Sequence, residues 1–355
     1  MKITRVTTEL RQSPFTYGGD GQGGNLRLRT MATLLVRVDT DAGVTGWGEA
    51  FGFTLAEVTQ RAVDALVAPL CIGQDPRDIA ALTGLLHRRL HNFGRNGPAS
   101  FAIAGVDIAL WDIAGRLAGL PLHRLLGGPE TPEVPAYASL LRYGDPDTVA
   151  RNAADAAAQG FTELKLHEID PACLRAARGA VPGLPLMIDM NCAFPAPEAI
   201  AWAAEIAPLS PRFIEEPVWP PEDFTAIAQV RAAGGLPVAA GECAGTVEEF
   251  RAMVAAGAVD VLQPSVAKLG ISRVLEVAAL ARENGLPVVP HAPYFGPALL
   301  ATAHLIAAWN QGAALECYHA SLEHPPFGDA LLPRDGRVAL PQSAGLGLDP
   351  VPEAA

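Results

Sequence analysis

Three acidic residues, each closing a short apolar run, have the types and spacing that could do chemistry together. Asp189 lies in LMIDMN, Glu215 in RFIEEP and Glu242 at the end of VAAGE. They are 26 and 27 residues apart, about the length of one strand, one helix and two short loops. Side chains at the carboxyl ends of successive barrel strands converge on one point. Because converging carboxylates repel one another, we expect them to hold a hard divalent cation, Mg²⁺ or Mn²⁺, with their oxygens.

Basic residues on two other predicted strands are candidates for proton transfer. Alternation along LKLH puts Lys165 and His167 on one face of a strand, here toward the barrel mouth. Neighbouring basic groups lower each other's proton affinity, so we expect Lys165 to act as a base near neutral pH. The alternative is a lysine that only pairs with a metal-binding carboxylate. His291, in PVVPHAPYFGP, would lie across the barrel from Lys165 and act as the acid.

Other polar residues near strand ends are given supporting roles. Glu316, in AALECY, would donate a proton to an oxygen of the intermediate or accept one from it. Asn191 follows Asp189 by two residues and is expected to orient the metal ligands, and Ser265 is expected to face the barrel mouth.

Four further residues near these motifs are interpreted as structural. Glu216 should point to the opposite face from Glu215, and Lys268 lies on the loop that follows the sixth strand. Cys192 and Cys243 adjoin the acidic motifs, but we expect both to be packing residues.

An alternation of apolar and alanine-rich segments begins near Val134 and predicts the elements that position these residues. It predicts an α/β fold with a parallel (β/α)8 barrel over residues 126–320. An open doubly wound sheet is the alternative, but it would not gather residues from all eight strands. The eight expected strands are VPAYASL, TELKLHE, PLMIDMN, RFIEEP, PVAAGE, VDVLQPS, PVVPH and AALECY.

The regions on either side of the barrel are predicted to form a capping domain. Residues 1–125 begin with an alternating hairpin around TDAG and continue with helical periodicity, which indicates an α+β domain. Residues 321–355 contain no further βα unit and are expected to return to this domain.

Composition excludes several classes of partner. The net charge of −12 argues against nucleic acid and anionic membranes. The N-terminus lacks an apolar targeting segment, and no apolar run reaches membrane-spanning length. Five cysteines without a CxxC pair are typical of reduced thiols. We therefore expect a cytoplasmic protein that acts on a small molecule.

These motifs resemble the enolase superfamily, and within it the mandelate racemase branch of the mandelate racemase/muconate lactonizing enzyme family. GVTGWGEA and FAIAGVDIALWDIAGRLAGLPLHRLLGG resemble its capping-domain signatures, and the Lys-x-His pair, the three acidic residues, His291 and Glu316 follow in its order. The resemblance implies a Mg²⁺-dependent enzyme, a Lys or His base, and a homo-oligomer, commonly a dimer or an octamer. It also implies that loops around 15–25 and 51–53 close over the substrate, with Tyr17 at the substrate site.

Two departures from the racemases of that branch narrow the implied reaction. Racemases usually have Lys-x-Lys where this chain has Lys165 and His167, and an aspartate partner for the histidine where this chain has Ser265. Without that partner for His291, symmetrical proton transfer is disfavoured. A lysine at the Ser265 position is typical of the muconate-lactonizing and dipeptide-epimerizing branches, which therefore fit poorly. The Lys-x-His pair and PHAPYFGP are similar to galactarolactone and anhydrogalactonate cycloisomerases, and the other site residues fit acid-sugar dehydratases.

The leading hypothesis is therefore a Mg²⁺-dependent lyase or isomerase. It would remove the proton alpha to a carboxylate of a sugar acid or its lactone and then eliminate a beta oxygen. The alternatives are a racemase or epimerase of a 2-hydroxy or amino acid derivative, a barrel glycosidase, which needs no metal, and a scaffold without activity. The buried charge cluster disfavours the last.

Overall fold

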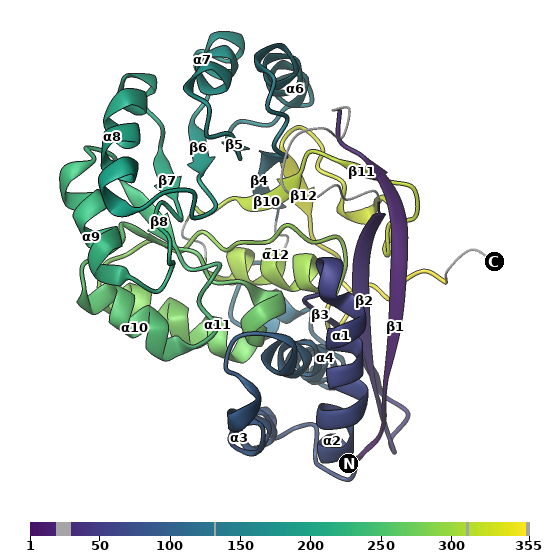
Figure 1. The fold of residues 1–355 in the computed structure, drawn as a ribbon. Helices are drawn as coiled ribbons and strands as arrows, with labels where there is room; N and C mark the ends of the chain where they lie inside the picture. The colour runs from purple at the N-terminus through teal and green to yellow at the C-terminus, as the bar shows by residue number, and fades with distance from the viewer. Residues whose placement is uncertain (19–29, 131–132, 310–311, 353–355) are drawn as a thin grey trace.

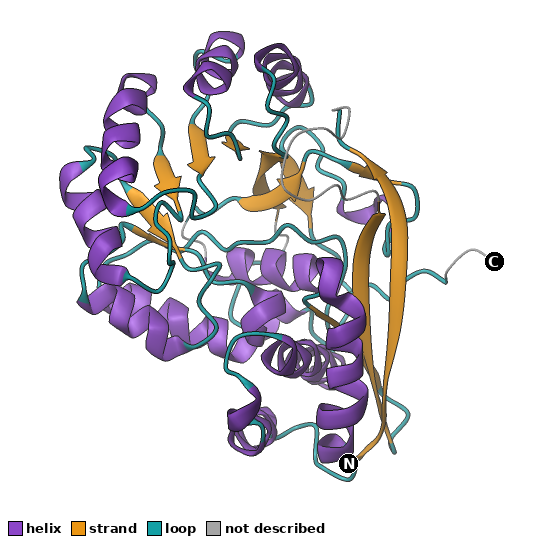
Figure 2. Ribbon diagram, in the orientation of Figure 1, coloured by secondary structure: helices purple, strands orange, loops and turns teal. Residues whose placement is uncertain are grey.

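A curled parallel sheet forms the centre of the molecule, and helices cover its outer face (Figures 1 and 2). The computed structural model describes residues 1–18, 30–130, 133–309 and 312–352. The parallel strands are ordered β10-β4-β5-β6-β7-β8-β9. They are β4 Glu133–Leu140, β5 Leu164–Leu166, β6 Leu186–Asp189, β7 Phe213–Glu215, β8 Val238–Ala240, β9 Val261–Leu262 and β10 Leu315–Tyr318. This arrangement confirms the predicted barrel.

The helices between these strands have amphipathic sequences and clear starts. Four of them begin at residues whose side chain accepts a hydrogen bond from a backbone N–H of the first turn, which satisfies an otherwise unpaired donor. These capping residues are Asp145, Asp170, Asp223 and Thr246. The barrel helices are α6 Pro146–Ala158, α7 Pro171–Ala180, α8 Ala196–Ile206, α9 Phe224–Ala233, α10 Val247–Ala255, α11 Val266–Glu283 and α12 Pro297–Trp309, with the 3-10 turn η4 Ala207–Leu209.

The predicted seventh strand, residues 287–291, is not a regular strand. It makes only isolated bridges to the segment at its side, through Val289 N to Leu262 O (3.0 Å) and His291 N to Pro264 O (3.2 Å). Pro287 and Pro290 have no N–H to donate, so a ladder to both neighbours is interrupted. The segment nevertheless occupies the place of a strand, and it carries His291 to the barrel mouth.

One layer of side chains fills the barrel interior. It takes one residue each from β4, β6, β7, β8 and β9, one from just before β10, and Val289 from the irregular segment, so the interior is a packed core. The layer is formed by Tyr137, Met187, Phe213, Ala239, Val261, Val289 and Ala314. Because side chains alternate along a strand, residues two positions after a member of this layer also face the barrel axis.

The capping domain packs a long helix on an antiparallel sheet. Strands β1 Ile3–Thr16, β2 Thr30–Thr40 and β3 Thr45–Ala50 form the sheet, as the TDAG turn predicts, and β11 Ser321–Leu322 joins its edge. Helix α4 Pro98–Ala118 approaches β3 closely, since a Cβ at Gly48 would lie 1.9 Å from the Gly105 carbonyl oxygen. The smaller elements are η1 Phe53–Leu55, α1 Ala56–Ala62, η2 Val63–Val67, α2 Ala68–Cys71, α3 Ile79–Arg89, η3 His91–Phe93 and α5 Leu122–Leu125.

Buried polar contacts join the capping elements to the barrel. The Glu49 carboxylate on β3 accepts a hydrogen bond from Ala298 N at the start of α12 (2.8 Å). Asp107 on α4 accepts hydrogen bonds from the backbone and the hydroxyl of Ser272 on α11. These contacts set how the cap lies over the carboxyl ends of the strands. Among the described residues, no helix has both the length and the apolar character needed to cross a membrane.

The C-terminal segment contacts both parts of the molecule. Strand β11 lies beside β1 of the cap, whereas β12 Arg337–Ala339 pairs antiparallel with β4 of the barrel, after the 3-10 turn η5 Gly328–Leu331. Further on, Leu346 O accepts a hydrogen bond from Nε2 of His304 (3.0 Å), and His304 Nδ1 lies 3.0 Å from Nδ1 of His123. A carbonyl only accepts, so Nε2 of His304 carries the proton, while Nδ1 accepts a hydrogen bond from the His123 backbone N–H (3.3 Å), so the ring is neutral. The stacked histidines thus connect α5, α12 and the C-terminal segment.

This histidine pair predicts a specific acid sensitivity of the fold. Burial lowers the pKa of His304 from 6.5 to about 3. The stability contributed by the neutral ring is therefore fully present above pH 6.5 and is lost as pH falls toward 3. The free energy of unfolding can be measured with denaturant at about pH 7.5 and about pH 5. Over this change in pH we expect it to fall by about 2 kcal/mol less in His304→Gln than in the wild type. The exposed His91 gives the control His91→Gln, and equal pH slopes in all three proteins would contradict the prediction.

Candidate active site

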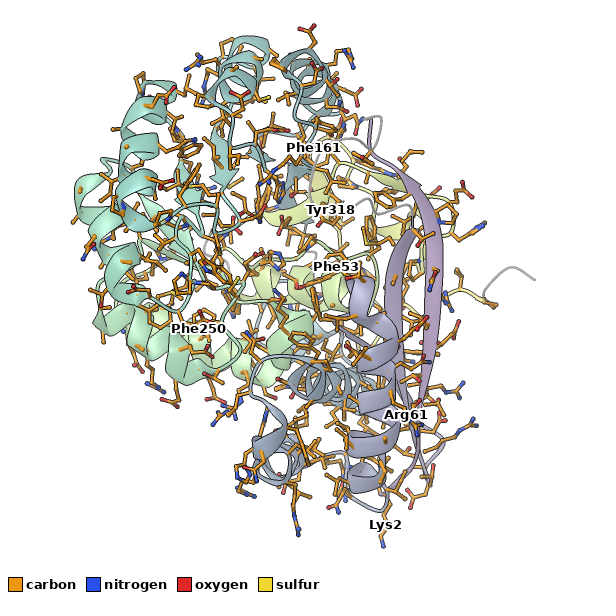
Figure 3. The ribbon with its side chains drawn as sticks, in the orientation of Figure 1. Lys2, Phe53, Arg61, Phe161, Phe250 and Tyr318 are labelled. Carbon is orange, nitrogen blue, oxygen red and sulfur yellow. The ribbon has the colours of Figure 1, made fainter. Side chains whose placement is uncertain are left out.

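A cavity of about 700 Å³ lies between the barrel mouth and the cap. Aromatic side chains from the cap and β10 line it, and Figure 3 labels Phe53 and Tyr318 among them. Polar groups from the strand ends complete the wall. The lining residues include Phe15, Tyr17, Phe51, Arg142, His167, Asp189, Asn191, Glu242, Lys268 and His291. Its volume suits a small-molecule substrate.

The three predicted acidic residues converge at the base of this cavity. Asp189 and Glu215 end β6 and β7 and are register partners, and oxygens of all three side chains lie within 4.8 Å of one another. Glu242 reaches the cluster differently, because it lies two residues beyond β8 and simple alternation from Ala239 would point it away. Gly241, with φ of 137°, redirects the chain, and a Cβ there would lie 2.6 Å from the Phe250 ring.

Lys165 lies beneath the acidic residues and is almost fully buried. Its Nζ is 2.8 Å from Glu215 Oε1, 3.0 Å from Asp189 Oδ2 and 3.3 Å from Glu316 Oε1. Burial alone would lower the pKa of Lys165, but the surrounding carboxylates outweigh burial and raise it well above its ordinary value. These contacts favour the ammonium form of Lys165, because the carboxylates outweigh its basic neighbour, and its role as the base stays a prediction.

His167 lines the cavity beside Asp189. Its Nδ1 lies 2.6 Å from the Leu140 carbonyl oxygen, so Nδ1 carries the proton and Nε2 keeps a lone pair. Burial lowers the pKa of His167, which keeps the ring neutral. Nε2 is 3.5 Å from Asp189 Oδ2. Lys165 and His167 therefore both approach the Asp189 carboxylate, as their predicted position on one face of the strand implies.

His291 approaches the acidic cluster from another side. Its Nε2 lies 2.5 Å from Glu242 Oε2. Burial would raise the pKa of Glu242, but His291 and Lys268 outweigh burial and hold this pKa well below its ordinary value. Lys165 and His291 therefore contact different members of the triad.

The structure gives His291 a partner that the sequence interpretation did not assign. The hydroxyl of Tyr294 lies 3.4 Å from His291 Nδ1 and 2.5 Å from Ser265 Oγ. Ser265 is fully buried; its backbone forms an isolated bridge with His291, and its hydroxyl is linked to the His291 ring through Tyr294. His291 thus has no aspartate partner at this position, but a neutral hydroxyl from Tyr294, three residues later, lies beside its Nδ1.

Glu316 is buried below the cavity and already has partners for both oxygens. Ser139 donates to Oε1 (2.8 Å) and Ala292 N donates to Oε2 (2.9 Å). Burial would raise the pKa of Glu316, but Lys165 and His291 outweigh it and lower this pKa to about 2. An ionised carboxylate only accepts, so the structure does not support the proton-donating role expected of Glu316.

The remaining predicted residues lie along the cavity wall. Tyr17 stacks on Tyr143 with ring centroids 5.9 Å apart, while residues 19–25 of the predicted closing loop lie outside the described residues. Asn191 orients Asp189 through its backbone, because its N–H donates to Asp189 Oδ1 (2.8 Å). Its φ of 46° takes it out of the strand, so strand alternation does not describe it.

Two cations on the wall were not predicted as functional. Arg142 donates to the His167 carbonyl oxygen and lies 3.4 Å from Asn191 Oδ1. Lys268 donates to the Glu242 carbonyl oxygen (2.7 Å) and lies 4.8 Å from the Phe51 ring centre. Arg142 follows β4 by two residues, so the rule that strand ends carry function would have found it. Lys268 is the residue that had been interpreted as structural.

The acidic cluster fits a hard divalent cation. The single ammonium group of Lys165 faces the carboxylates of Asp189, Glu215 and Glu316, so the acidic groups outnumber the charge that Lys165 supplies. Asp189 Oδ2 is buried and has no hydrogen-bond partner among the described residues, although it is ion-paired with Lys165. Carboxylate oxygens are the ligands that Mg²⁺ prefers. Asp189, Glu215 and Glu242 are thus the residues that would hold it.

Comparison with known proteins identifies the family. Residues 26–127 match the N-terminal domain of mandelate racemase/muconate lactonizing enzymes, and residues 148–354 match the enolase C-terminal domain-like family. D-galactarolactone cycloisomerase of Agrobacterium fabrum is 34% identical, over 98% of this chain and 96% of that protein. D-galactonate dehydratase of Ralstonia pickettii is 35% identical, over 87% and 80%.

A solved structure supports the same assignment. A racemase from Streptomyces coelicolor with bound magnesium superposes with a TM-score of 0.84 at 28% identity, over 97% of this chain and 96% of that one. The chain is therefore an enzyme of the enolase superfamily and belongs to its mandelate racemase/muconate lactonizing enzyme family.

Proposed function

We propose that this enzyme removes the proton alpha to the carboxylate of a sugar acid or its lactone and then expels a beta oxygen. Expulsion of a hydroxyl would make it an acid-sugar dehydratase, and expulsion of a lactone or ring oxygen a cycloisomerase. The relatives named as a galactarolactone cycloisomerase and a galactonate dehydratase support this substrate class. The observation that carries the proposal is that Lys165 and His291 contact different members of one carboxylate triad.

Two residues carry out the two proton transfers of the proposed reaction. Lys165 takes the alpha proton after its ammonium group has given up a proton to solvent, and His291 gives a proton to the departing oxygen. Arg142 and Lys268 place positive charge on the cavity wall, where hydroxyl or carboxylate oxygens of the substrate would lie. A bound Mg²⁺ would neutralise the carboxylates that hold Lys165 charged and would stabilise negative charge on the substrate carboxylate.

Reaction in D₂O with Mg²⁺ tests the proposal. Sugar acids and their lactones would be incubated with the enzyme and followed by NMR. The proposal expects a keto-deoxy acid or a rearranged lactone, with deuterium incorporated only where the product gains a proton. Return of unreacted substrate in both configurations, with deuterium at the alpha carbon, would instead establish the racemase or epimerase alternative.

The Tyr294 contact gives a prediction about the positioning of His291. Tyr294→Phe removes the hydroxyl that lies between His291 and Ser265, so we expect kcat to fall by about 10- to 100-fold with a much smaller change in KM. Tyr143→Phe is the control, because its buried hydroxyl has no hydrogen-bond partner among the described residues and its ring stacks at the same cavity. Equal effects of the two substitutions, or a change confined to KM, would show that Tyr294 only shapes the cavity.

A further inference from the structure

A second cluster of metal-binding side chains lies on the loops that carry the acidic triad. The thiols of Cys192 and Cys243 and the carboxylate of Glu216 bring their ligand atoms within 4.8 Å of one another. The Cys243 thiol also lies 4.0 Å from Glu242 Oε1, so the cluster adjoins the acidic triad. Each residue comes from a different loop, after β6, β7 and β8 respectively for Cys192, Glu216 and Cys243. The proposed reaction uses none of the three.

The backbone holds these loops in an unusual form that brings the side chains together. Cys192 has φ of 57° and Glu216 has φ of 42°, a region that non-glycine residues rarely adopt. Cys192 N donates to the Glu216 carbonyl oxygen (2.8 Å), and Gly241 N donates to Glu216 Oε1 (2.9 Å). From the cap, Asn96 Nδ2 donates to the Cys243 carbonyl oxygen (2.6 Å). The cluster is therefore preorganised by its own backbone contacts.

We propose that Cys192, Cys243 and Glu216 form a binding site for a thiophilic divalent cation such as Zn²⁺, separate from the Mg²⁺ site. Tetrahedral coordination with Zn–S bonds of about 2.3 Å separates two sulfur ligands by about 3.8 Å. Ligand atoms within 4.8 Å of one another reach this geometry by shifts of about 1 Å or less. On binding, the two thiols release two protons to solvent and the cation takes their place.

The position of the cluster favours a cation over simple packing. Glu216 is 1% exposed, and its carboxylate is held by the hydrogen bond from Gly241 N, so it is a fixed ligand shielded from bulk water. Cys192 and Cys243 are only half-buried, and Cys192 lines the cavity, so an ion can enter and a fourth ligand can reach it. Sulfur ligands select Zn²⁺ or Co²⁺ over Mg²⁺, so saturating Mg²⁺ does not compete.

Titration of the Mg²⁺-saturated protein with Co²⁺ tests the site. The proposal expects about one equivalent of Co²⁺ to give a thiolate-to-Co²⁺ charge-transfer absorption in the near ultraviolet, and Zn²⁺ to remove it by displacement. Cys192→Ser and Cys243→Ser should each abolish the absorption. Glu216→Gln, which keeps an acceptor for Gly241 N, should weaken Co²⁺ binding by at least about tenfold.

Two control variants separate this site from the acidic triad and from other thiols. Asp189→Asn removes a Mg²⁺ ligand and should keep the Co²⁺–thiolate absorption, as should Cys71→Ala, whose thiol is buried in the cap. Circular dichroism establishes that each variant is folded. No thiolate absorption in the wild type, or an absorption unchanged in Cys192→Ser or lost in Asp189→Asn, would overturn the proposal.

Discussion

Replacement of Lys165 with methionine should slow exchange of the substrate alpha proton by about 10²- to 10⁴-fold, the range that a positioned general base contributes. Methionine keeps most of the buried aliphatic volume and removes only the amine. Lys165 is the basic group that contacts both Asp189 and Glu215, so the alpha carbon of a substrate carboxylate held at these residues would lie near it. Loss of the alpha-proton signal in D₂O, followed by NMR, measures the exchange directly.

Two other variants show whether the effect belongs to Lys165 alone. Lys268→Met removes a second lysine from the same cavity and should mainly raise KM, because Lys268 contacts the Glu242 carbonyl oxygen and the Phe51 ring. His167→Gln removes the imidazole whose Nε2 lies 3.5 Å from Asp189 Oδ2. Exchange that survives in Lys165→Met but disappears in His167→Gln would make His167 the base and contradict the proposed division of roles.

Alternation along parallel strands explains why much of the site could be predicted. Asp189 and Glu215 follow Met187 and Phe213 by two residues, and both of these belong to the interior layer. Alternation of side chains along each strand was therefore enough to predict where Asp189 and Glu215 lie. The same alternation predicted that Lys165 and His167 share a face. The barrel was predictable because its segments repeat with helices between them, and the family match confirms it.

The residues that escaped prediction depend on irregular backbone or on long-range contacts. Glu242 reaches the triad only because Gly241 has φ of 137°, which alternation does not describe. Tyr294 meets His291 because the proline-rich chain turns after residue 291, a geometry without a periodic signal. Glu316 is one of the three carboxylates that keep Lys165 charged, and it lies 151 positions later in the sequence, so no local pattern could reveal this contact.

Removal of divalent cations should abolish turnover while leaving the wild-type protein folded. We expect the triad to hold a metal ion that stabilises negative charge, and metal ions in this role contribute several kcal/mol, or about 10³-fold or more in rate. The fold survives because Lys165 supplies a positive charge 2.8 Å from Glu215 and 3.0 Å from Asp189. Chelation followed by Mg²⁺ addition tests both the loss of turnover and the retention of the fold, with activity and thermal unfolding measured at each step. Activity that persists after exhaustive chelation would favour the glycosidase alternative.

The same contacts predict that the inactive Lys165→Met protein binds Mg²⁺ at least about tenfold more tightly than the wild type. The ammonium group contacts Asp189 and Glu215, the two carboxylates that we expect to bind the metal ion, so its removal takes away a competitor of the metal ion. Without metal, the variant leaves buried carboxylates unpaired and should lose about 3–5 kcal/mol of stability, most of which Mg²⁺ should restore. Calorimetric titration measures the affinity, and Asp189→Asn, which loses a ligand, should bind more weakly. If Lys165→Met bound Mg²⁺ no better than the wild type, Lys165 and the cation would not share the carboxylates, and the assignment of Asp189 and Glu215 as metal ligands would fail.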